Sequence, residues 1–313
     1  MKYNEDAQLD TSEVQDTRRS GGRLPSSRGG QVALGGGGLG IVGVLVVVLV
    51  SVLGGGGGNS VDVGSVLGGL GQSGAPAMAD NSQVKQECRT GADANTKSDC
   101  AAVANIDSIQ AYWATELAKL GKRYIPVPTV WFSGQVSTAC GGATSASGPF
   151  YCRADKRVYI DLTFYEDLQK QFGAEGGLFP NAYVLAHEYG HHVQDLLGTE
   201  ARVSSRQGPT SGSVRLELQA DCYAGVWAKH ATEPGADGSP PLITAITNDD
   251  FDRALDTAGR IGDDWIQTNL GGGTVQQGEF THGTSAQRRR WLTTGYQTGD
   301  LHACDTFGTD NLG

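Results

Sequence analysis

The stretch Ala182–Leu197, AYVLAHEYGHHVQDLL, constrains this chain most, because it joins helical signals to an H-E-x-x-H spacing at His187, Glu188 and His191. Gly198 suits the residue just beyond the end of such a helix. Residues four apart lie on one helix face, so the two histidines can bind one metal ion. Glu188 could then reach a metal-bound water as its general base. The motif alone is equally compatible with an amphipathic helix that partly buries two histidines.

A second helical stretch, Ser213–Ala231 (SVRLELQADCYAGVWAKHA), places Glu217 and Asp221 one turn apart. A catalytic zinc site uses three protein ligands and keeps one position open for water, and Glu217 can be the third ligand of a Zn²⁺ site. Asp221 could accept the free ring N–H of a ligand histidine and fix its tautomer. The alternative is a helix with two solvated carboxylates, but the flanking residues leave little polar face.

These motifs resemble those of known zinc peptidases. HEYGH followed by ELQAD is similar to the H-E-x-x-H and E-x-x-A-D pair of the membrane-linked HtpX and CAAX-prenyl-protease type. The element HGTSAQR, from His282 to Arg288, is similar to their T-H-P-x-x-x-x-R, with Gly283 in place of proline. The wider pattern more closely resembles the bacterial "putative neutral zinc metallopeptidase" family. It includes a Gly-rich anchor, GPFYC, VYIDLTF, HEYGHHVQ, ELQADCYAGVWA, FTHGTSAQR and CDTF, and it covers roughly residues 86–309 plus the anchor.

The resemblance implies a zinc metalloendopeptidase with an α+β, helix-rich, zincin-like domain and a small β-sheet. Glu188 would be the catalytic base. His282 could donate to the oxyanion of the tetrahedral intermediate, or it could simply anchor the loop before the last helix. Arg288 could bind the oxyanion or a carboxylate, or it could form a salt bridge to an acid such as Asp221. His192 points about 100° away from its neighbour His191 on a helix, which excludes it as a ligand.

The segment Arg157–Phe164, RVYIDLTF, alternates well enough to be a strand. In zinc peptidases of this general plan, an edge strand near the H-E-x-x-H helix commonly binds the substrate backbone as an added strand. By resemblance, this segment is the candidate for that role. An ordinary strand inside the sheet is an equally good interpretation.

The N-terminal part has a different composition. Residues 29–61 carry no charge and include the apolar run LGIVGVLVVVLVSVL. We expect a disordered cytoplasmic tail at 1–30, a transmembrane helix at 31–58, a Gly/Ser-rich linker at 59–85 and the peptidase domain at 86–313. The arginines before the apolar run predict a single-pass protein of the cell membrane, with a cytoplasmic N-terminus and an extracytoplasmic domain. A cleaved signal peptide is the alternative, although a small-x-small site lies only far downstream.

All six cysteines follow the apolar run, and an even number on the exported side favours disulfides. Short loops predict the pairs Cys88–Cys100 and Cys140–Cys152, which leaves Cys222–Cys304. Metal ligation by cysteine is less favoured, because no pair has the C-x-x-C spacing.

The net charge of −10 on 313 residues argues against nucleic acid as a partner. The expected partners are a peptide or protein substrate and the membrane. The expected activity is hydrolysis of peptide bonds by zinc-activated water, with Glu188 as general base. The alternatives are a catalytically silent zinc domain that binds envelope proteins and a membrane-tethered structural protein without metal.

Overall fold

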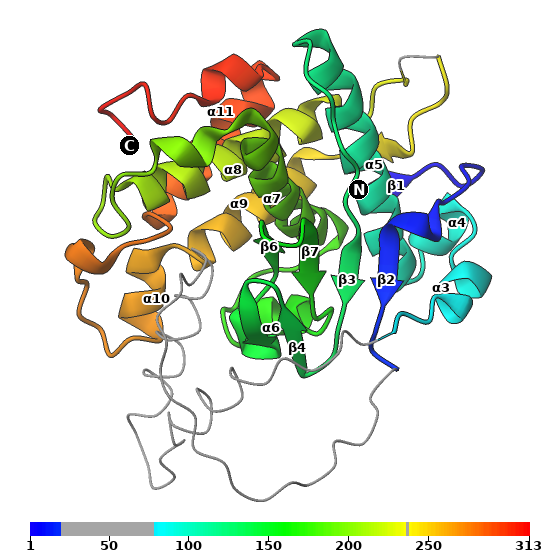
Figure 1. Cartoon of the computed structure of the whole chain (residues 1–313), viewed down its shortest axis with the longest axis horizontal. Helices are drawn as coiled ribbons and strands as arrows, with labels where there is room; N and C mark the ends of the chain where they lie inside the picture. Colours follow the sequence, from blue (N-terminus) through cyan, green and yellow to red (C-terminus); the bar gives the residue numbers. More distant parts are fainter. Residues whose placement is uncertain (20–77, 236–237) are drawn as a thin grey trace, which may run out of the picture.

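The computed structural model describes residues 1–19, 78–235 and 238–313, and Figure 1 shows how their elements are arranged. Among these residues the main sheet has four short strands, in the order β2 (Val14–Asp16), β3 (Thr129–Trp131), β7 (Arg157–Ile160) and β6 (Phe150–Cys152). Strands β2 and β7 run parallel to β3, and β6 runs antiparallel to β7. Helices make up far more of the described chain than strands do, so the predicted helix-rich α+β class with a small sheet is confirmed.

The remaining described elements surround this sheet. The paired strands are β1 (Lys2–Tyr3) with β8 (Ile243–Ala245), and β4 (Gln135–Thr138) with β5 (Gly141–Thr144). The helices are α3 (Ser82–Glu87), α4 (Gly91–Ala94), α5 (Ser98–Lys119), α6 (Phe164–Lys170), α7 (Leu178–Leu197), α8 (Gly212–His230), α9 (Asn248–Arg260), α10 (Asp263–Asn269) and α11 (Ser285–Thr298).

The two faces of the sheet bury different cores, because side chains alternate along each strand. Trp131, Val158 and Ile160 belong to the main core, which the helices complete. Phe150 and Tyr159 belong to a smaller cluster, which is covered by side chains of the β4–β5 hairpin. The helices therefore pack on one face of the sheet, and α7 contacts β6 there.

Helix α7 lies in the middle of the helical layer and packs against α5, α8 and α9 (Figure 1). It is buried on nearly every side from Phe179 to Gln194, as expected for a helix that is apolar around most of its circumference. It ends at Gly198, whose φ of 75° is the left-handed conformation that favours glycine. The helix predicted around H-E-x-x-H is thus confirmed.

Small residues bring α7, α8 and α11 into close contact. A Cβ on Gly190 would lie 3.1 Å from the Cα and the carbonyl oxygen of Ala220. A side chain at this position would therefore push α7 away from α8. A Cβ on Gly295 would lie 1.9 Å from the carbonyl oxygen of Cys222, so α11 crosses α8 backbone to backbone. The glycine of HEYGH and the alanine of ELQAD therefore set the spacing between the two motif helices.

Residues 1–19 are folded into this domain. Strand β2 pairs with β3, and the hydroxyl of Tyr3 donates to Asn105 on α5 at 2.8 Å. Arg18 forms ion pairs with Asp16 and Asp99 at 2.7 and 2.8 Å. The prediction of a disordered tail over residues 1–30 is wrong for 1–19. The strand is only three residues long and shows no periodicity, so its order depends on partners far along the chain.

The chain returns to the same place after residue 77. The backbone N–H of Asp80 donates to the carbonyl of Asp16 at 2.8 Å, and the Asn81 side chain accepts from the Asp16 N–H at 2.9 Å. Helix α3 starts at Ser82, so the domain begins before the predicted boundary at residue 86.

These contacts bear on the predicted membrane topology. The predicted transmembrane helix at 31–58 lies outside the described residues, and none of the helices within them is both long and apolar enough to span a bilayer. A single crossing between residues 20 and 77 would place β2 and β3 on opposite sides of a membrane. The predicted cytoplasmic N-terminus below an extracytoplasmic domain is therefore incompatible with this sheet.

The three predicted disulfides are confirmed: Cys88–Cys100, Cys140–Cys152 and Cys222–Cys304. Of the two interpretations of RVYIDLTF, the ordinary strand inside the sheet is confirmed and the edge strand is wrong, because β7 lies between β3 and β6. In the described part of the chain the edge next to α7 is β6, which comes from the GPFYC segment.

Candidate metal centre

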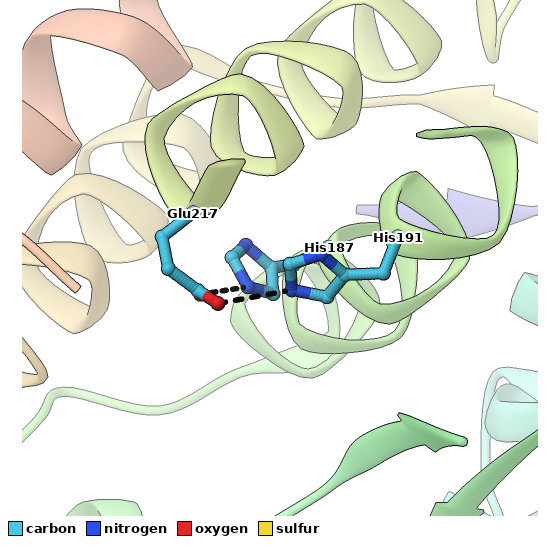
Figure 2. Close-up of side chains that lie close together, drawn as sticks. All are labelled: His187, His191 and Glu217. Carbon is cyan, nitrogen blue, oxygen red and sulfur yellow. Dashed lines mark hydrogen bonds and ion pairs between the residues drawn. The ribbon is translucent and has the colours of Figure 1, made fainter. Parts of the chain in front are cut away.

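Helices α7 and α8 bring His187, His191 and Glu217 together in a buried cluster. The Nε2 atom of His187 lies 3.1 Å from Oε2 of Glu217, and the Nε2 atom of His191 lies 3.5 Å from Oε1. The possible ligand atoms all lie within 4.8 Å of one another. Figure 2 shows the two imidazoles on α7 and the carboxylate on α8 pointing toward one another. The structure thus brings together the three residues predicted as ligands.

The donor set and spacing suit zinc. Ligand atoms about 2.0–2.1 Å from a tetrahedral zinc ion are about 3.3 Å from one another, close to the two nitrogen–oxygen distances above. Oε1 of Glu217 is buried and accepts no hydrogen bond. A buried carboxylate oxygen without a donor is costly unless a cation binds it. Two histidines and one glutamate would hold the ion and leave a fourth position open.

Asp221 orients His187 from behind. Its Oδ1 lies 2.8 Å from Nδ1 of His187 and accepts from the Tyr183 hydroxyl at 2.7 Å. Arg288 donates to both oxygens of Asp221, at 2.8 and 2.9 Å. Burial favours the neutral acid, but Arg288 and His187 outweigh it and lower the pKa of Asp221 to about 2. The charged carboxylate holds the proton of His187 on Nδ1, which leaves Nε2 for a metal.

Gln194 gives His191 the corresponding support. Its Oε1 lies 2.8 Å from Nδ1 of His191, and its amide donates to the Leu216 carbonyl at 2.7 Å and to Gln219 at 3.0 Å. This chain of bonds fixes the orientation of the amide, and so the proton of His191 lies on Nδ1. Sequence reasoning missed Gln194, although its position three residues after His191 on a helix was a readable signal.

Glu188 lies between the cluster and the sheet edge. The backbone N–H of Tyr151 in β6 donates to its carboxylate, while Oε2 is buried without a hydrogen-bond partner. Burial raises the pKa of Glu188, and the neighbouring His187 and His191 only partly offset that effect. A carboxylate with one anchored and one unpartnered oxygen is well placed to exchange a proton.

His282 reaches the cluster from the loop before α11. Its Nδ1 lies 2.7 Å from the Thr281 hydroxyl and 3.5 Å from Asp263. Asp263 also accepts the backbone N–H groups of residues 281–283, at 2.7, 2.7 and 2.9 Å. Burial lowers the pKa of His282, but Glu217 and Asp263 outweigh it, so the net shift is upward. Sequence reasoning missed Asp263, because the turn that it holds comes from a different segment.

A family model described as "Putative neutral zinc metallopeptidase" matches residues 1–307. The chain belongs to this family. The family implies zinc, and the cluster of His187, His191 and Glu217 is a possible site for it.

Relatives of this chain occur in Escherichia coli and in mycobacteria. The "Uncharacterized protein YpfJ" of Escherichia coli K12 is 36% identical over 316 residues, covering 96% of each chain. The "Uncharacterized protein Rv2575" of Mycobacterium tuberculosis H37Rv is 46% identical over 229 residues, covering 72% of this chain and 76% of the relative. No solved structure matches the chain.

A cleft opens onto the cluster, with about 670 Å³ of space between its walls, open solvent at its mouth included. Glu188, His282 and Arg288 line it together with the three candidate ligands. His192 does not, since its Nε2 bonds to the Ile125 carbonyl at 2.7 Å on another side of α7. Its exclusion as a ligand agrees with this placement.

Proposed function

We propose that this protein is a zinc metalloendopeptidase that hydrolyses peptide bonds, with Glu188 as general base. The observation that carries the proposal is the buried, unpartnered Oε2 of Glu188 beside the His187–His191–Glu217 cluster, in a cleft open to solvent. Membership of the zinc metallopeptidase family supports the same reaction class.

Zinc bound by these three residues would supply Lewis acidity, which polarises a carbonyl and makes water more acidic. Glu188 takes a proton from the water that attacks the peptide carbonyl. It then delivers that proton to the nitrogen of the leaving amine as the C–N bond breaks. The Tyr151 N–H holds one carboxylate oxygen of Glu188 in place during both transfers.

His282 and Arg288 have different roles in this proposal. His282 faces the cleft and donates to the developing oxyanion, while Asp263 holds its ring in position. The Nε and Nη2 groups of Arg288 donate to Asp221 and Tyr183, and Nη1 donates to the Ile261 carbonyl, so we assign Arg288 to positioning the carboxylate behind His187. Of the roles predicted for Arg288, its contacts correspond to the salt bridge with Asp221.

The test is peptide hydrolysis by the zinc-loaded full chain beside a Glu188→Gln variant. Glutamine keeps the shape and the bond from Tyr151 but cannot accept the proton. We expect zinc content to stay equal and turnover to fall by roughly 10²–10⁴-fold. Equal turnover in both proteins would refute the role of Glu188. Zinc binding without hydrolysis in the wild type would favour the alternative of a silent zinc-binding module.

We also propose an extracytoplasmic location for the domain, including residues 1–19. The three disulfides support it, because such bonds persist in oxidising compartments. Thiol labelling in intact cells before and after reduction would check it. All six cysteines should react only after reduction, and immediate labelling would contradict the location.

A further inference from the structure

The cleft beside the metal cluster has an apolar half whose function the reaction does not explain. Its lining includes Pro149, Phe164, Phe172, Val184 and Ile261. The charged members of the described lining, apart from the histidines, are Glu188, Glu217 and Arg288, and all three already have roles in the centre. The rest of the cleft therefore offers apolar surface and no additional charge.

This apolar half lies next to the position of the reacting bond. Val184 is one turn before His187 on α7, so both side chains lie on the same helix face. The Ile261 carbonyl accepts from Arg288 at 3.2 Å, which ties the end of α9 to the network behind His187. An occupant of the apolar half would therefore touch the metal side of the cleft.

The walls of the pocket are held by contacts with one another and with residues behind them. Phe172 is buried and stacks on Trp265, with ring centroids 6.2 Å apart. Gly148 lies beside the ring of Phe164, where a Cβ would be in ordinary contact at 3.4 Å, and its φ of 68° favours glycine. Phe164 and Ile261 remain partly exposed and so can exchange water for a ligand. Such a preformed apolar pocket gains affinity from a side chain that fills it.

We propose that this pocket is a specificity subsite, which takes a large uncharged apolar side chain next to the bond that is cleaved. The substrate class is thus a peptide with leucine, isoleucine, methionine or phenylalanine at one of the two residues joined by that bond. The placement of the subsite next to the cleaved bond rests on the proposed peptidase function. The apolar character of the pocket does not depend on that function.

The first test uses the zinc-loaded full chain on a mixed peptide library, with cleavage sites read by mass spectrometry. We expect large apolar residues to exceed charged ones by roughly tenfold or more at one position next to the cut. An Ile261→Glu variant should shift that position toward lysine and arginine, and Ile261→Lys toward aspartate and glutamate. Val275→Glu, at an exposed residue outside the cleft lining, is the matched control and should keep the wild-type profile.

A second measurement does not depend on turnover. Zinc-loaded Glu188→Gln protein is titrated calorimetrically with short peptides that differ only by leucine or aspartate at the varied position. Roughly tenfold tighter binding of the leucine peptide, lost in the Ile261→Glu double variant, supports the subsite. Equal affinities, or an Ile261 variant with the wild-type profile, overturn it. Absence of all cleavage by the wild type would refute the peptidase proposal, and the binding comparison would still decide the subsite.

Discussion

The α7–α8 pair and the N-terminal strand β2 are both buried, yet they are built from different interactions. Between α7 and α8, charged and polar side chains bind one another in a network that centres on Asp221. Strand β2 is held by backbone pairing to β3 and by the burial of Val14. The α7–α8 pair forms the candidate metal site, and β2 completes the sheet against which the helices pack. Perturbing each region should therefore change different properties of the protein.

The largest expected effect is the loss of Arg288. An Arg288→Met substitution leaves the fully buried carboxylate of Asp221 without its cation, which should lower the free energy of unfolding by about 3–5 kcal/mol. Denaturant titration of the full chain would measure it. The exposed neighbour Arg290→Met should cost no more than about 0.5 kcal/mol. A loss as small as that of the control would show that the network does not stabilise the helix pair.

The next effect concerns the distance between the motif helices. Gly190→Val would place a branched side chain against the backbone of Ala220, and we expect a loss of about 3 kcal/mol from overpacking. Zinc affinity should also fall, by roughly the hundredfold seen when support of a ligand is lost. Calorimetric titration with zinc would measure the affinity. Leu197→Val, at the half-buried end of α7, is the control, because it puts the same β-branched residue into the helix away from the contact with α8. Unchanged zinc affinity would contradict the role of this contact.

Strand β2 should affect stability without affecting the metal. Val14 is fully buried, so Val14→Ala should lower the free energy of unfolding by about 2 kcal/mol. The folded protein should bind zinc as tightly as the wild type, because β2 lies at the opposite edge of the sheet from β6, the strand beside α7. Val275→Ala at an exposed site is the control. A loss of zinc affinity in the Val14 variant would break the separation between the two regions.

The smallest effect depends on pH and also lies near the N-terminal segment. Burial raises the pKa of Asp107 to about 7, the Asp10 N–H bond lowers it in part, and the Asp10 and Glu13 carboxylates raise it further. The folded state thus binds this proton more tightly than the unfolded chain does, so its stabilising effect is lost as pH rises through about 7. Asp107→Asn should remove about 1 kcal/mol of the decline in stability between pH 6 and 8. Identical pH profiles of unfolding would contradict it.

The same contrast explains what could be predicted from the sequence. Local spacing on two helices encodes the candidate ligands, so the cluster of His187, His191 and Glu217 could be proposed without coordinates. Gln194 shared that signal and was overlooked. Asp263 belongs to α10 and acts on a turn from another segment, and no local pattern connects them. Strand β2 pairs with β3, which is more than a hundred residues away in the sequence. Without that partner in view, the short charged segment resembles a disordered tail.

The edge strand shows a further limit. Alternation predicts a strand over Arg157–Phe164, of which Arg157–Ile160 forms one, but alternation does not give strand order. In the observed strand order, β7 lies inside the sheet, and the shorter β6 is the edge strand beside α7. The cysteine pairs were predictable because two of them close short loops.

The most direct test of the account is the zinc content of the full chain, including residues 1–19, beside Glu217→Ala and Val14→Ala variants. We predict one zinc ion per chain in the wild type and in Val14→Ala, and zinc that is lost or much weakened in Glu217→Ala. A well-folded wild type without zinc, or a Glu217→Ala variant that binds it fully, would contradict a metal centre formed by His187, His191 and Glu217.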